Sequence, residues 1–217
     1  MQLNPSSSSS VKSSGVPIDV RSLNWTQQLA SDYIYNFNRL EPFFSGNPTK
    51  RSDWEKSITR RHETPYPNNQ VVDMLIAQQR QRQAPPNAIT ATTKLRDPRT
   101  IAIVTGQQAG LFGGPLFTFL KALTTIKLAN QVSQDYAVPT VAVFWIDADD
   151  HDWEEVRSCS VLDSKFQRQK ISLPLRTSAS EQPMGSILLD DSIAAAIDEL
   201  ATTLNPSEFS QKLLTDI

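Results

Sequence analysis

The spacing of apolar residues predicts different structures on the two sides of residue 100. Residues 101–104 and 141–146 are short apolar runs without alternation, which is typical of strands buried on both faces of a parallel sheet. Between them, residues 116–132 place apolar side chains on one helical face, and Pro115 fits the first helical position. A strand, a helix and a second strand in this order are typical of a βαβ crossover. We therefore expect an α/β fold with a Rossmann-like parallel sheet.

The segment before residue 100 shows helical periodicity instead. Its clearest stripe has spacings of four, four, four and three residues and consists of Trp25, Leu29, Tyr33, Phe37 and Leu40. This stripe predicts one amphipathic helix over residues 21–40. Shorter patterns predict a helix over residues 53–61 and another from residue 71 to the prolines at 85 and 86. We expect these helices to precede the sheet rather than to belong to it.

These patterns divide the chain into three regions. Residues 1–15 are mostly serine and have almost nothing apolar to bury, so we predict a disordered tail. Residues 16–99 form the helical segment, and residues 100–217 form the Rossmann-like core. The last residues have the pattern of another helix that is cut short, so we expect the core to be truncated at its C-terminal end.

The second half of the core has weaker patterns. Apolar residues predict two further strands, over residues 156–162 and 169–173. A helix is predicted over residues 190–204, with the inward positions Ile193, Ala196, Ile197 and Leu200. These elements extend the α/β pattern beyond the first crossover.

Charge and cysteine content exclude several classes of protein. Lysine and arginine total 21 against 23 acidic residues, without a block of like charge, which argues against a nucleic-acid partner. Cys159 is the single cysteine, so an intramolecular disulfide and a multi-cysteine zinc site are excluded, and a cytoplasmic location is expected. No apolar run approaches the roughly 20 residues that cross a bilayer. We expect a soluble protein without a membrane partner.

A glycine-rich motif, TGQQAGLFGGPLFT, follows the first predicted strand. Ligands bind at this end of strands in open α/β sheets, and glycines let a backbone approach a ligand. The predicted substrate-binding or anion-binding residues of this motif are Thr105, Gly106, Gln107, Gln108, Gly110, Gly113 and Gly114. Their spacing matches neither the dinucleotide fingerprint nor the phosphate loop, and a turn without a ligand is the alternative. Lys121 follows in the helix, where we expect it to face solvent rather than a bound phosphate.

An acidic motif, FWIDADDHDWEEV, follows the second predicted strand. It places seven ionisable groups in nine positions, and such crowding raises carboxylate pKa values and favours binding of cations or proton transfer. We predict that Asp150, His151 and Asp152 are catalytic and that Asp149 binds substrate, with no dedicated metal site. Asp152 stands where an EF-hand loop needs glycine, which excludes that motif. The alternative is a solvated acidic turn that caps a helix near Trp153.

Together the stretches TGQQAGLFGGPLFTFLKA and VFWIDADDHDWEEV resemble the paired signature of the bacillithiol biosynthesis cysteine-adding enzyme family. Residues 32–44 and 183–189 are also similar to stretches of that family, so the resemblance runs from about residue 16 to the end. Two departures stand out. Asp149 lies before the DHD triplet, where the family has glutamate, and the chain is less than half the usual family length.

The resemblance implies a ligase that joins the carboxyl group of L-cysteine to the amine of glucosaminyl malate, the last step of bacillithiol biosynthesis. It also implies a core similar to class I aminoacyl-tRNA synthetases and nucleotidyl transferases, with ATP and Mg²⁺ as expected cofactors and a homodimer as the full-length protein. The H-x-G-H motif of adenylate chemistry is absent from the sequence. A different adenylate-forming enzyme or nucleotidyl transferase, or a non-catalytic binding fragment, remains the alternative.

The resemblance further implies roles for individual residues. Gln107 and Gln108 would orient a substrate, and the amides of Gly113 and Gly114 would face an anion, either a phosphate or the malate carboxylates. The Asp150 to Asp152 triplet would bind the amine or assist proton transfer. Two substrates and a nucleotide need more binding and positioning groups than two motifs provide, so we expect this chain alone to be inactive.

Overall fold

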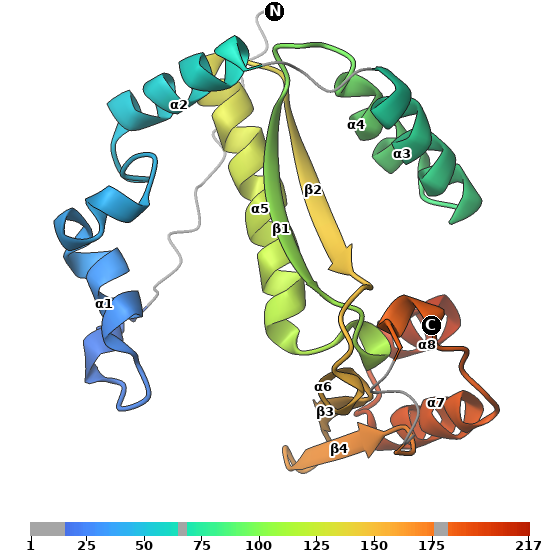
Figure 1. Cartoon of the computed structure of the whole chain (residues 1–217). Helices are drawn as coiled ribbons and strands as arrows, with labels where there is room; N and C mark the ends of the chain where they lie inside the picture. Colours follow the sequence, from blue (N-terminus) through green and yellow to red (C-terminus); the bar gives the residue numbers. More distant parts are fainter. Residues whose placement is uncertain (1–15, 65–68, 176–181) are drawn as a thin grey trace, which may run out of the picture. The chain divides into compact units, whose positions relative to one another are not determined.

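The computed structural model describes residues 16–64, 69–175 and 182–217. The predicted serine-rich tail, residues 1–15, lies outside the described residues. The chain forms two compact units, Met1–Arg61 and His62–Ile217, which Figure 1 colours along the sequence. Over the described ranges, no helix combines the length and the apolar character needed to cross a membrane.

The first unit consists of short helices joined by turns. Its elements are η1 (Val20–Ser22), α1 (Gln28–Tyr35), η2 (Phe37–Arg39), η3 (Glu41–Phe43) and the start of α2 (Arg51–Glu63). The single helix predicted over residues 21–40 is therefore wrong. Asn36 leaves the helical conformation at φ −135° and ψ 44°, and its side chain donates to the buried Asp32 carboxylate at 3.2 Å. This backbone conformation does not continue a helix, so α1 ends after about two turns.

The second unit is built on two parallel strands. β1 (Ile101–Gln108) and β2 (Thr140–Asp147) pair in parallel from Ile101 opposite Thr140 to Gln108 opposite Asp147. The helix α5 (Leu116–Tyr136) connects them and contacts both. The predicted order of strand, helix and parallel strand is confirmed. In Figure 1 the two strands run side by side with α5 along them.

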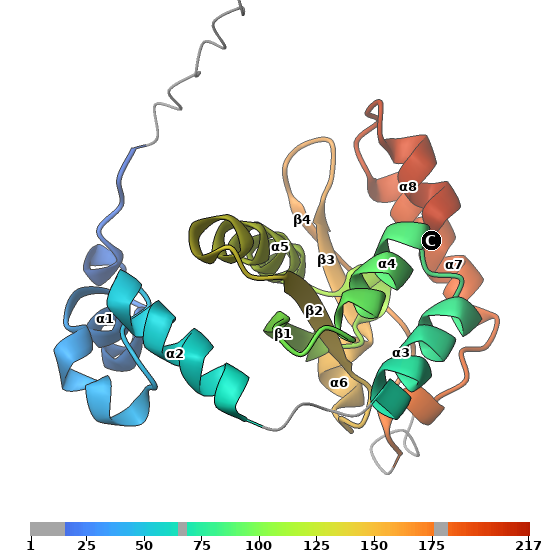
Figure 2. The same cartoon turned by 90° about the horizontal axis from the view of Figure 1, so that it is seen from above.

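Two further helices lie on the other side of the strands. α3 (Asn69–Gln81) packs against α4 (Pro86–Lys94), and α4 contacts β2. Figure 2 shows α5 on one side of the strand pair and these helices on the opposite side. The helices predicted from residues 53 and 71 are confirmed as α2 and α3, whereas α4 was missed because Pro86 was taken as a stop. Proline is tolerated in the first turn of a helix. The predicted boundary at residues 99 and 100 stays a prediction.

The sheet-facing side of α5 is not its most apolar side. Thr125, Ala129 and Val132 are buried, whereas the apolar stripe that periodicity identified is exposed. This exposed stripe comprises Leu116, Phe119, Leu120, Leu123 and Ile126. Near the start of α5, Lys121 contacts Gly106 and Gln107, which lie close to the end of β1.

We expect alanine substitutions on the two faces of α5 to have different effects on stability. Val132 is 2% exposed and Leu123 is 63% exposed. Val132→Ala should lower the free energy of unfolding by about 2 kcal/mol, because it removes two buried carbon atoms and leaves a cavity. Leu123→Ala should change it by less than about 0.5 kcal/mol. Urea denaturation of both variants checks this, and a larger loss at Leu123 would contradict the observed orientation of α5.

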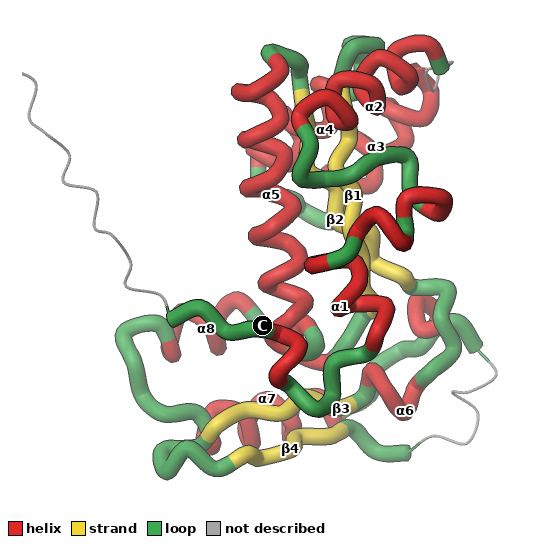
Figure 3. The backbone as a smooth tube through the Cα atoms, turned by 90° about the vertical axis from the view of Figure 1, so that its left-hand side faces the viewer, coloured by secondary structure: helices red, strands yellow, loops and turns green. Residues whose placement is uncertain are grey.

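The second unit ends in a lobe that has its own apolar core. Its elements are α6 (Trp153–Val156), the antiparallel strands β3 (Ser158–Leu162) and β4 (Arg168–Ser172), η6 (Met184–Ser186), α7 (Ser192–Thr203) and α8 (Ser210–Asp216). Figure 3 shows β3 and β4 beside α7, which contacts β4. The predicted strands and helix are confirmed, with Ala196 and Leu200 of α7 buried. Leu111, from the glycine-rich motif, enters the same core.

Candidate functional site

The two sequence motifs leave the sheet at the same edge. The register pairs Gln107 with Ile146 and Gln108 with Asp147, so β1 and β2 end side by side. The loop after β1 leads to α5, and the loop after β2 leads to α6. The carboxyl ends of parallel strands are where ligands bind in open α/β sheets. This edge is therefore the candidate site.

The strand β1 is longer than its apolar run predicts. Thr105, Gly106, Gln107 and Gln108 belong to the strand, not to the loop that follows it. Gly106 has a steric reason, since a Cβ there would lie 2.7 Å from the carbonyl oxygen of Trp145 on β2. Glycine at this position thus allows the two strands to approach closely near their ends.

A tight turn connects β1 to α5. Gly113 and Gly114 have φ angles of +85° and +78°, a backbone conformation that suits glycine. Their amides donate to the carbonyl oxygens of Gly110 and Leu111, each at 3.0 Å. Both amides are therefore engaged within the turn, and the turn does not present them as a cradle for phosphate. Anion binding by these glycines stays a prediction, while their positions have a local structural reason.

Exchanging glycine and alanine at the two ends of α5 tests whether these positions need a positive φ angle. Gly114→Ala should destabilise the protein by about 1 to 3 kcal/mol, because a side chain is placed at φ +78° and ψ −159°. Ala137, just beyond α5, has φ 51° and ψ 39°, and Ala137→Gly should stabilise by about 1 kcal/mol because glycine relieves the left-handed strain. Thermal melting measures both changes. Equal shifts in the same direction would be inconsistent with these conformations.

A chain of polar contacts links α5 to the acidic motif. Lys121 Nζ donates to Gln107 Oε1 at 2.8 Å and to the Gly106 carbonyl oxygen at 3.3 Å. Gln107 Nε2 donates to Gln108 Oε1, and Gln108 Nε2 donates to Glu155 Oε2 at 3.3 Å. Lys121 is half-buried, so the expectation that it faces solvent is wrong. Its contacts join residues 14 and 15 positions apart, which helical periodicity alone does not reveal.

The loop after β2 folds around the Asp150 carboxylate. Asp150 Oδ1 accepts the backbone amides of His151 at 2.7 Å and Asp152 at 3.3 Å. The His151 amide, followed by the Gln108 side chain and the Asp152 amide, holds the pKa of the Asp150 carboxyl below its usual value against the opposing effect of desolvation. The expectation that crowding raises carboxylate pKa values is wrong for Asp150, because the amide donors outweigh the effect of desolvation. Asp150 is therefore ionised at neutral pH.

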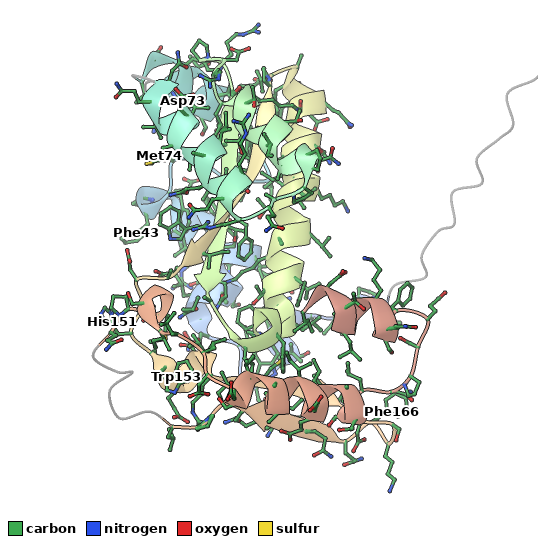
Figure 4. All side chains as sticks on the ribbon, turned by 90° about the vertical axis from the view of Figure 1, so that its right-hand side faces the viewer. Phe43, Asp73, Met74, His151, Trp153 and Phe166 are labelled. Carbon is green, nitrogen blue, oxygen red and sulfur yellow. The ribbon has the colours of Figure 1, made fainter. Side chains whose placement is uncertain are left out.

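Asp152 has a structural role at the start of α6. Its Oδ1 accepts the Glu155 amide at 3.0 Å, which caps the helix that begins at Trp153. This is the contact that the alternative interpretation of the motif requires. The side chains of Asp149 and His151 are exposed, and Figure 4 labels His151 together with Trp153, whose ring is buried in the lobe core. The cap fixes the backbone from which Asp150 and His151 project.

A third segment, which motif spacing did not identify as part of the site, supports the acidic loop. The amides of Met184 and Gly185 donate to the carbonyl oxygens of Asp150 and Ala148, both at 2.8 Å. A Cβ at Gly185 would lie 3.0 Å from the Cβ of Ala148, so the two segments are in close contact. The only signal for this segment in the sequence was the family-like stretch at residues 183–189.

An apolar cavity of about 280 Å³ lies between the glycine-rich turn and the lobe. Its walls are formed by Ala109, Gly110, Leu111, Phe112, Trp153, Val156, Leu173, Met184, Ile187, Leu189 and Ile193. Both motifs contribute to these walls, yet the carboxylates of the acidic loop lie outside them. The described ranges contain no group of three or more His, Cys, Asp or Glu residues placed to hold a metal ion, and we assign no metal ligand.

Comparisons with known proteins identify the family that this chain resembles. The family model described as "Bacillithiol biosynthesis BshC, N-terminal Rossmann-like domain" matches residues 16–217. A relative from Salinibacter ruber named "Putative cysteine ligase BshC" is 30% identical over 188 residues, which is 86% of this chain and 34% of the relative. A relative of the same name from Halalkalibacterium halodurans is 30% identical over 179 residues, which is 82% of this chain and 33% of that protein. Another, from Solibacter usitatus, is 42% identical over 123 residues, which is 57% of this chain and 22% of that protein.

This chain matches only part of each of these relatives. It spans about a third of the length of the Salinibacter ruber and Halalkalibacterium halodurans relatives. The family model covers the sheet, the glycine-rich turn, the acidic loop and the lobe. The chain therefore belongs to the bacillithiol biosynthesis BshC family and matches its N-terminal Rossmann-like domain.

Proposed function

We propose that this chain is the N-terminal part of a ligase that joins the carboxyl group of L-cysteine to the amine of glucosaminyl malate in the last step of bacillithiol biosynthesis. Membership of the BshC family supports a role in that biosynthesis. The observation that carries the proposal for this site is the register that sets Gln108 opposite Asp147. It joins the glutamine pair and the acidic loop at one edge of the sheet.

The residues at this edge have chemistry that suits the proposed substrates. The amides of Gln107 and Gln108 both donate and accept hydrogen bonds, which allows them to orient the hydroxyl and carboxylate groups of a sugar malate. An ionised Asp150 attracts the ammonium group of the amine substrate. The ammonium group loses one proton to solvent, and the resulting amine attacks an activated cysteine carboxyl carbon. A C–N bond forms, the activating group leaves and the nitrogen loses a second proton. His151, with its exposed imidazole, is the proposed acceptor of that proton.

The cofactors, the cellular location and the oligomeric state stay predictions. ATP and Mg²⁺ are the expected source of carboxyl activation, and the engaged amides of Gly113 and Gly114 do not provide a phosphate cradle in this conformation. A cytoplasmic location and a homodimeric longer protein also stay predictions. We propose that the chain by itself binds substrate without turning it over. The acidic loop is exposed, and the positioning of two substrates requires further residues around them.

A chimera tests the proposed function. Residues 16–217 would replace the matching domain of the Salinibacter ruber relative, and thiol labelling with mass spectrometry would measure bacillithiol formed from L-cysteine and glucosaminyl malate. The chimera should form bacillithiol, and the chain alone should be at least roughly 100-fold slower, since it lacks most of the positioning groups. A chimera that melts cooperatively like its parent and yields no bacillithiol would refute the proposal.

A further inference from the structure

Lys121 occupies an unusual place for a lysine. It lies on the side of α5 that faces the sheet, one turn before the buried Thr125, and its side chain is half-buried. Its Nζ lies within hydrogen-bonding distance of two oxygens, Gln107 Oε1 and the Gly106 carbonyl oxygen. The charge also lies over the ring of Phe117, with Nζ 5.0 Å from the ring centroid. A solvated lysine would have none of these contacts.

The contacts of Lys121 impose a direction on the neighbouring amides. An ammonium group only donates hydrogen bonds, so Gln107 must present its Oε1 to Lys121. The opposite end of the same amide, Nε2, then donates to Gln108 Oε1. Gln108 in turn directs its Nε2 at the acidic motif, where Glu155 Oε2 accepts it at 3.3 Å. Each amide has a single orientation that satisfies its neighbours.

The alternative orientation is unfavourable only while Lys121 is present. A side-chain amide is nearly symmetrical in shape, so it can exchange its oxygen and nitrogen at little steric cost. If both glutamine amides turned over, Gln108 would direct an oxygen at the carboxylate of Glu155, and two acceptors would face each other. Lys121 opposes this reversal at the other end of the hydrogen-bonded series, because Gln107 would then direct its NH₂ group at the Lys121 ammonium.

We propose that Lys121 is a positioning residue that orients the side-chain amides of Gln107 and Gln108, so that Gln108 presents an N–H group to the acidic loop. The value of this orientation for catalysis rests on the proposed function, because it keeps an N–H donor, rather than an oxygen, facing the carboxylates that would attract an ammonium substrate. The orientation itself is a property of this chain and is measurable without turnover.

Three variants of the 217-residue chain test the proposal. Lys121→Met keeps the side-chain length and removes the donor. Lys127→Met is the matched control, since Lys127 lies on the same helix with its side chain exposed. Gln107→Glu keeps an acceptor for Lys121 but has no N–H group for Gln108, so it breaks the chain of contacts one step further on.

Nuclear magnetic resonance gives two readouts. In Lys121→Met, the side-chain amide signals of Gln107 and Gln108 should move toward those of solvent-exposed glutamine, and the titration midpoint of the Asp150 carboxyl should rise toward its ordinary value. Gln107→Glu should shift the Gln108 amide and raise the same midpoint. Lys127→Met should leave all three signals at their parent positions.

Unchanged Gln108 and Asp150 signals in both Lys121→Met and Gln107→Glu would overturn the proposal. Melting temperatures identify a variant that has lost its fold, and the Gln107→Glu variant then decides the matter, because it keeps the Lys121 contact. Failure of the chimera to make bacillithiol would leave these signals unaffected. The two proposals therefore fail on different measurements.

Discussion

Replacing Trp153 with alanine should lower the free energy of unfolding of the second unit by about 4 kcal/mol, the typical loss for a buried tryptophan. Its side chain is 7% exposed in the lobe core, and its Nε1 donates to the carbonyl oxygen of Pro174 at 3.1 Å. Trp153 also begins α6, directly after the acidic loop. The loss of its ring should therefore release the loop, with faster amide exchange at His151 and Asp152.

Trp145 provides a matched control within the same motif. It lies on β2, eight residues earlier, and its side chain is 63% exposed. Trp145→Ala should cost less than about 1 kcal/mol, because little apolar surface returns to water. Guanidinium denaturation compares the two variants. Losses of equal size would show that Trp153 does not anchor the acidic loop to the lobe core.

Changes in the acidic loop should reduce turnover without unfolding the protein. In the active chimera, Asp150→Asn and His151→Ala should each lower the rate of bacillithiol formation at least roughly 100-fold, the scale on which positioned charged and proton-transferring groups act. His151 is exposed and Asp150 is only partly buried, so melting temperatures should change little.

Glu154 is the control for this second experiment. It pairs with Arg157 at 2.9 Å, which holds the pKa of the Glu154 carboxyl below its usual value. The contact of Gln108 is with the next residue, Glu155. Glu154→Gln removes one charge from the same motif and should retain most of the parent rate. If Glu154→Gln lost as much activity as Asp150→Asn, the total negative charge of the motif would explain the loss of activity better than a specific role of Asp150.

Local patterns were sufficient to predict the strands and most helices. The apolar runs that became β1 and β2 and the periodicity of α7 depend on neighbours within a few residues, which a sequence displays directly. Two errors have the same origin. The residue pattern does not show that Asn36 leaves the helical conformation, nor that Pro86 begins a helix instead of ending one.

Contacts between distant residues were harder to predict. Periodicity identified an apolar stripe on α5 but not which neighbours would cover it, and the buried face proved to be that of Thr125 and Val132. The sequence indicated either a ligand-binding loop or a simple turn at Gly113 and Gly114, whereas the partners of their amides depend on the path of the turn. The contact of Lys121 with Gln107 forms only when α5 packs against β1, so no local sequence pattern predicts it.

Ligand titration of the 217-residue chain tests the central claim, that the glycine-rich motif and the acidic motif form one substrate site at the ends of β1 and β2. Glucosaminyl malate would be added while the backbone and side-chain amide signals are followed by nuclear magnetic resonance. We expect four signals to shift together along one binding curve: the side-chain amides of Gln107 and Gln108 and the backbone amides of His151 and Asp152. Shifts confined to one motif or to other parts of the chain, or no shifts at millimolar ligand, would contradict it.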